Sequence, residues 1–139
     1  MVPSSPPKTT QNPDFSRVKF HREKRPFERE CCVYQRLREE QTTRILGFNV
    51  PQLLSIDEEF RAIEMTIVRS PFLLDFADAL LDQAPDFSED VLRQWEEDKA
   101  ETFGERWSEV TDVLTALQVF GIHLLDINPH NISFLQDTR

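Results

Sequence analysis

The chain has 139 residues, with 25 acidic and 16 basic side chains and a formal net charge of -9. That length leaves room for one domain. An acidic balance of this size argues against a nucleic acid or an anionic membrane as the partner, because phosphate groups attract basic surfaces. The sequence contains no run of 18 apolar residues, which is the length needed to span a bilayer. Together these features predict a cytoplasmic protein.

Two local features add to this prediction. Residues 1–16 are polar and rich in Pro, Ser and Thr, which predicts a flexible N-terminal tail. Cys31 and Cys32 are the only cysteines and lie next to each other, so a disulfide framework is excluded. We expect both to be partly buried thiols in a reducing compartment.

The N-terminal half predicts a strand, a helix and a hairpin. A short strand is expected over residues 17–20, where apolar residues flank Lys19. A helix is expected over 27–40, because apolar residues recur there every three or four positions. Strands are expected over 50–56 and 60–68, joined by an acidic turn.

The C-terminal half has the apolar period of helices. We expect a short helical segment over 71–81, a helix capped by Ser88 that ends near Phe103, and a helix over 105–120 that ends at Gly121. A loop follows that helix. The order of strand, helix, hairpin and helices predicts an α+β fold in two layers.

The loop after Gly121 carries the most suggestive polar residues. Asp126 and Asn131 are five residues apart, and Pro129 fixes the turn between them, so a carboxylate and an amide are expected side by side. Phosphoryl transfer uses this spacing. The carboxylate orients or deprotonates the acceptor hydroxyl, and the amide oxygen holds Mg²⁺. Asp126 and Asn131 are therefore the candidate catalytic residues, and Asn131 is also the candidate metal ligand.

With this loop, the sequence resembles the protein-kinase-like superfamily. Lys19, in Val-Lys-Phe, is similar to the lysine of that family's third strand, and Glu30 is similar to its partner on the following helix. The resemblance implies that the two form an ion pair that holds Lys19 for the phosphates of ATP.

The resemblance extends to the strands and the lobes. Glu64, Met65 and Thr66 are similar to the segment against which adenine lies. The implied fold is kinase-like over residues 17–139, with a small N-lobe over 17–68 and a partial helical C-lobe over 69–139 that ends after the catalytic loop.

Three parts of the family pattern are missing. No Gly-x-Gly-x-x-Gly motif precedes Lys19, and no Asp-Phe-Gly segment follows Asn131. Leu124 and Leu125 stand where the usual loop has His-Arg, with His123 one place early.

Two functions of different classes follow from this pattern. The first is an atypical or degenerate kinase-like protein that binds ATP and transfers a phosphoryl group to a hydroxyl acceptor, with Mg²⁺ as cofactor if it is active. The second is a catalytically inactive, pseudokinase-like interaction module that binds a protein partner through exposed apolar or acidic surface.

The same residues also have structural explanations that stay open. Asp and Asn beside a proline commonly cap turns. Lys19 is also compatible with a solvated strand position, and Glu30 with an exposed helix face. His123, Asp126 and His130 are a further, three-ligand candidate for a metal such as Zn²⁺.

Overall fold

The computed structural model of the protein describes residues 16–134. The predicted tail over 1–16 lies outside these residues, except for Ser16, which begins the first strand. The elements form a mixed α+β fold, as predicted.

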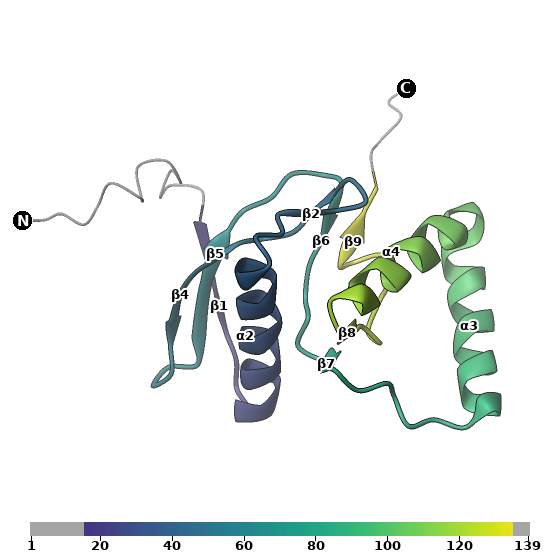
Figure 1. Ribbon diagram of the computed structural model, residues 1–139, viewed down its shortest axis with the longest axis horizontal. Coiled ribbons are helices and arrows are strands. Elements are labelled where there is room, and N and C mark those ends of the chain that lie inside the picture. The colour runs from purple at the N-terminus through teal and green to yellow at the C-terminus, as the bar shows by residue number, and fades with distance from the viewer. Residues whose placement is uncertain (1–15, 135–139) are drawn as a thin grey trace, which may run out of the picture.

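The predicted N-terminal strand and hairpin form one antiparallel sheet of order β1-β5-β4 (Figure 1). Its strands are β1 (Ser16–Phe20), β4 (Leu53–Asp57) and β5 (Ala62–Thr66). β5 lies in the middle, and its Ile63 is paired with Lys19 of β1 and Ile56 of β4. The predicted hairpin is therefore confirmed, with shorter strands than expected.

The predicted first helix is α2 (Lys24–Glu39), which lies along one face of this sheet (Figure 1). It begins three residues earlier than expected, since Pro26 fits a first helical turn, where backbone amides need no intrahelical partner. Its buried face includes Phe27, Tyr34 and Leu37. Burying such side chains stabilises the fold by about 1.5–3 kcal/mol each.

The helical segment predicted over 71–81 is wrong. Those residues contain two short strands, β6 (Phe72–Leu73) and β7 (Leu80–Leu81), with a turn at residues 77–78 between them. Their partners come much later in the chain: β6 pairs with β9 (Ile132–Ser133), and β7 pairs with β8 (Ile122–His123). The apolar pattern reflected burial rather than helical geometry.

β6 also connects the two halves of the molecule. It belongs to a four-stranded sheet of order β2-β3-β6-β9, in which β6 runs parallel to β3 and antiparallel to β9. The two remaining strands of this sheet are β2 (Arg44–Ile45) and β3 (Phe48–Asn49).

The two C-terminal helices are confirmed. In α3 (Glu89–Phe103), the hydroxyl of Ser88 caps the N-terminus by accepting a hydrogen bond from the amide of Val91 at 3.2 Å. A 3-10 turn leads into α4 (Trp107–Val119). Gly121 follows with φ of +78°, a conformation that ends helices readily.

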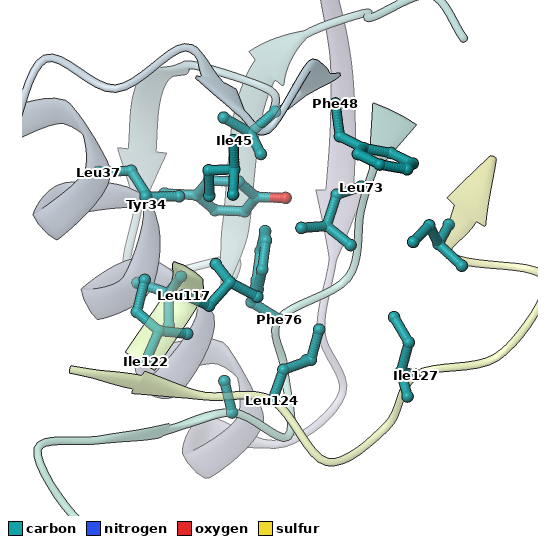
Figure 2. Close-up of a cluster of buried hydrophobic side chains, with 14 of the residues drawn as sticks. Tyr34, Leu37, Ile45, Phe48, Leu73, Phe76, Leu117, Ile122, Leu124 and Ile127 are labelled. Atoms are coloured by element: carbon teal, nitrogen blue, oxygen red, sulfur yellow. The ribbon is translucent and has the colours of Figure 1, made fainter. Parts of the chain in front are cut away.

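One apolar core joins the sheet-bearing half to the helical half (Figure 2). Tyr34 of α2, Phe76 after β6, Leu117 of α4 and Ile127 of the loop are all fully buried. The rings of Tyr34 and Phe76 pack edge to face, with their centroids 5.4 Å apart. The loop after α4 is thereby packed against the same core as α2.

Candidate functional site

Lys19 and Glu30 form the ion pair that the resemblance implies. Lys19 lies on the face of β1 that packs against α2, and its Nζ is 3.0 Å from Glu30 Oε1. Glu30 is fully buried in α2, so it does not belong to an exposed helix face. Lys19 is one-quarter exposed, which leaves its ammonium group accessible at the wall of a cleft.

Glu30 is held by further donors besides Lys19. His21 Nε2 lies 2.8 Å from Oε1, and the backbone amide of Phe76 donates to Oε2 at 2.9 Å. A buried carboxylate requires such partners, since an unpaired charge in the interior is strongly disfavoured. The position of Glu30, and therefore of Lys19, is fixed by contacts from two separate segments, residues 19–21 and the segment after β6.

Lys19 has a second acidic partner that the sequence analysis did not identify. Asp75, in the segment after β6, places its Oδ1 3.0 Å from Lys19 Nζ. Burial acts to lower the pKa of Lys19, but the charges and hydrogen bonds of Glu30 and Asp75 outweigh it, and the pKa is raised above its ordinary value. Lys19 therefore stays positively charged in the cleft.

The loop after α4 is ordered by its own side chains. Asn131 is buried; its amide group donates to the backbone carbonyl of Asp126 at 2.6 Å, and its Oδ1 accepts from the amide of Asn128 at 2.9 Å. The side chain of Asn128 donates to Asp126 Oδ1 at 3.1 Å. These bonds also explain Asp126 and Asn131 as turn-stabilising residues, so both interpretations are compatible with the geometry.

Lys19 and Asn131 face one cleft of about 380 Å³. Its walls come from β1, α2, β5, the segment after β6, and the loop. The lining residues are Arg17, Lys19, Glu30, Tyr34, Met65, Leu74, Asp75, Asn128, His130 and Asn131. The cleft is thus polar on the side of β1 and the loop and apolar near Met65 and Leu74.

Asp126 does not line this cleft. It borders an open depression together with Arg29, Asp78 and Leu125. Asp126 and Asn131 are therefore neighbours joined by a hydrogen bond, but the carboxylate and the amide face different hollows. The carboxylate and the amide that were expected side by side are adjacent in the loop but do not line one common cleft.

The adenine-binding residues expected on β5 divide between the two faces of the sheet. Met65 is buried and lines the cleft. Glu64 accepts hydrogen bonds from the hydroxyls of Ser16 and Ser55 at 2.9 and 3.0 Å, and the amide of Thr66 donates to Gln52 at 3.0 Å. Because β5 is the middle strand, its backbone is flanked by neighbours on both sides.

The three-ligand metal candidate gains no support from the geometry. Within residues 16–134, no group of three His, Cys, Asp or Glu side chains is arranged to hold a metal ion. His123, Asp126 and His130 therefore do not form a site of the zinc type. A Mg²⁺ site at a nucleotide does not require three such side chains, because oxygen atoms of the phosphates supply ligands and only one or two protein carboxylates are needed.

A larger depression of about 640 Å³ lies on another side of α2, between α2, β4 and the turn that follows β4. It is lined in part by Phe27, Cys31, Cys32 and Ile56. None of the predicted site residues borders it. We therefore place the candidate site in the smaller cleft, where charged and amide side chains converge.

No local sequence signal singles out Asp75. The Asp-Phe pair of the segment that the resemblance places after Asn131 occurs before it at 75–76, but also at 14–15 and 86–87. The pairing of β6 with β9 brings the segment at 75–76 to Asn131, and no local pattern announces that pairing.

Comparisons with known proteins add no relative. No protein-family model, curated protein or solved structure matches this chain. Among residues 16–134, no helix combines the length and the apolar character needed to cross a membrane.

Proposed function

We propose that this protein is an atypical kinase-like protein that binds ATP in the cleft between β1, α2 and the loop after α4. The proposal includes transfer of a phosphoryl group to a hydroxyl acceptor. The observation that carries it is the Lys19–Glu30 ion pair at 3.0 Å, in a cleft also lined by Asn131. Kinases need such a lysine and glutamate in place for phosphoryl transfer.

The arrangement of elements supports the same proposal. A strand carrying Lys19, a helix carrying Glu30 and an antiparallel strand pair come in the order that the resemblance implies for a small N-lobe over 17–68. A long helix, α4, leads into the loop with Asp126 and Asn131. We assign residues 69–134 to the helical C-lobe on this basis.

Each residue has a distinct role in this proposal. Lys19 contacts the phosphates, and Glu30 positions Lys19. Met65 provides the apolar wall for adenine, since of the three β5 candidates only Met65 lines the cleft. For Glu64 and Thr66, the geometry supports structural roles in the sheet.

Asp126 is the proposed base. It borders the open depression, and its connection to the cleft is Asn128, which lines the cleft, so the acceptor hydroxyl would have to lie between the two hollows. Its hydrogen bond from Asn128 holds the carboxylate in one orientation. Mg²⁺ supplies charge neutralisation on the phosphates when bound, and Asn131 is the loop residue that would hold it.

ATP binding tests the proposal through thermal unfolding of the full chain. ATP at 100 times its dissociation constant should stabilise the protein by about 2.7 kcal/mol. Lys19→Met keeps the apolar stem and removes the charge, so we expect ATP affinity to fall about 10–100-fold. Lys24→Met is the matched control, because Lys24 is an exposed lysine of α2 outside the cleft. Equal ATP binding by both variants would remove Lys19 from the site.

Phosphoryl transfer is tested separately with Asp126→Asn. We expect this variant to bind ATP normally and to lose transfer by a factor of at least about 100. Asp86→Asn makes the same charge change at an exposed position before α3 and should retain activity. Transfer at the wild-type rate by Asp126→Asn would show that another group acts as base.

The second candidate function is an inactive, pseudokinase-like interaction module. The observation that favours it is the outer face of β1, where Val18 and Phe20 are 49% and 68% exposed. Apolar side chains at that exposure are suited to a protein partner. Absence of any ATP-dependent stabilisation at millimolar ATP would favour this function over the first.

A further inference from the structure

We infer that the carboxylate of Asp75, together with the amide oxygen of Asn131, binds the divalent cation that accompanies the nucleotide. This inference rests on the proposed function. It assigns to a residue before the loop the role that the family pattern gives to an aspartate after it. In this chain the segment with the metal-binding aspartate would then come before the loop with Asn131, whereas in the family pattern it comes after that loop.

The pairing of β6 with β9 places Asp75 beside Asn131. Phe72 is paired with Ser133 and Leu73 with Ile132. The amide of Leu74 then donates to the carbonyl of Asn131 at 2.8 Å. The next residue along the chain is Asp75, so its position relative to Asn131 is set by backbone hydrogen bonds.

The residue after Asp75 is fixed equally firmly. The amide of Phe76 donates to buried Glu30 at 2.9 Å, and the ring of Phe76 is fully buried against Tyr34. Asp75 is therefore anchored on both sides, by the loop through Leu74 and by α2 through Phe76. A ligand held in this way keeps its orientation when the metal is absent.

The side chain of Asp75 is available for a ligand. It is 41% exposed and uses Oδ1 for Lys19, while within residues 16–134 no hydrogen bond reaches Oδ2. Its backbone has φ of +72°, a region that Asp and Asn tolerate better than other L residues.

Asn131 is suited to the second ligand position. Its Oδ1 accepts one hydrogen bond, from Asn128, and an amide oxygen has a second lone pair. One carboxylate, one amide oxygen, phosphate oxygens and water form the usual surroundings of Mg²⁺ at a nucleotide site. The residues present therefore fit the cation.

The experiment compares ATP binding with and without metal in the full chain. Dissociation constants for ATP are measured by calorimetry in EDTA and in MgCl₂, for the wild type, Asp75→Asn and Asp86→Asn. Asparagine is chosen because it also tolerates φ of +72°. Asp86→Asn makes the same charge change at an exposed site away from the cleft.

We expect Mg²⁺ to tighten ATP binding by the wild type and by Asp86→Asn. In Asp75→Asn, the ratio of the ATP dissociation constant in EDTA to that in MgCl₂ should be at least about tenfold smaller than in the wild type, as expected for loss of a metal-holding residue. ATP binding in EDTA should persist or improve in this variant, because a negative charge near the phosphates is gone. Electron paramagnetic resonance of Mn²⁺ with protein and ATP should show the same loss of bound metal.

The outcomes separate the inference from the function on which it rests. Full retention of the Mg²⁺ effect by Asp75→Asn overturns the inference and leaves the proposed function standing. No ATP binding by the wild type overturns the proposed function, and the inference with it. If Asp75→Asn does not fold, Asp75→Glu is measured instead. This variant keeps the carboxylate but moves it by the length of one methylene group. An unchanged Mn²⁺ signal in Asp75→Glu overturns the inference.

Discussion

Glu30 and Phe76 are joined by a hydrogen bond of 2.9 Å from the backbone amide of Phe76 to the carboxylate of Glu30. This bond connects α2 to the segment after β6. The same carboxylate contacts Lys19 of β1 and His21 just beyond that strand. A single buried acidic side chain thus links the sheet, the helix and the segment that carries Asp75.

Replacing this carboxylate should destabilise the whole fold. Glu30→Gln keeps the shape but removes the charge that Lys19 and His21 contact, so we expect a loss of about 1.5–3 kcal/mol of unfolding free energy. Glu28→Gln, on the exposed face of the same helix, affects only an i,i+4 pair and should lose about 0.3–0.5 kcal/mol. Urea denaturation measures both. Similar losses in the two variants would contradict the central role of Glu30.

The raised pKa of Lys19 predicts a loss of stability at alkaline pH. Burial lowers this pKa, and Glu30 and Asp75 raise it by more. The contribution of a lysine with a raised folded-state pKa is fully present below its unfolded value, about 10.4, and is lost as the pH rises through the folded value. The difference in stability between wild type and Lys19→Met should therefore shrink above that pH. A difference that stays constant from pH 8 to pH 11 would show that the ion pair does not contribute.

The two adjacent cysteines should differ in reactivity. Both thiols were predicted to be partly buried, but Cys31 is buried and Cys32 is exposed. Burial, with smaller effects of Cys32 and Glu30, raises the pKa of the Cys31 thiol to about 11. Because the thiolate is the reactive form, Cys31 should react with a disulfide reagent at pH 8 at least about tenfold more slowly than Cys32.

Single variants make this comparison direct. Cys32→Ser should leave one slow thiol, and Cys31→Ser should leave one fast thiol. The raised pKa also means that the folded state holds its proton longer than the unfolded state, so Cys31 lowers stability as the pH rises toward 11. Equal reaction rates of the two single variants would refute the prediction.

Gly121 should be less tolerant of a side chain than Gly47. Both have positive φ, +78° and +87°, so alanine at either position is strained by about 1–2 kcal/mol. At Gly121 an added Cβ would also meet the carboxylate of Asp82 and lie 2.7 Å from Arg36 Nη1, whereas at Gly47 nothing lies within 4 Å. Gly121→Ala should therefore lose more stability in a thermal melt. Equal losses would mean that the Arg36–Asp82 pair moves aside freely.

The periodic elements were predictable from the sequence. The apolar stripe of α2, the Ser88 cap of α3 and the apolar repeat of α4 are local patterns, and local hydrogen bonds form those helices. Lys19, Glu30 and Asn131 were also identified from the sequence, through their similarity to a family pattern. The structure brings these three to one cleft.

The sequence alone determined the helices α2, α3 and α4, because their apolar repeats and the Ser88 cap depend on neighbours within a few positions. Only the tertiary structure decided that residues 71–81 hold two short strands, and that Asp75 contacts Lys19 and lines the same cleft as Asn131. Strands of two residues have almost no intrinsic preference, and they exist because β9 and β8 supply hydrogen-bond partners from far along the chain. The chemistry available in the cleft therefore depends on long-range pairing that no local pattern encodes.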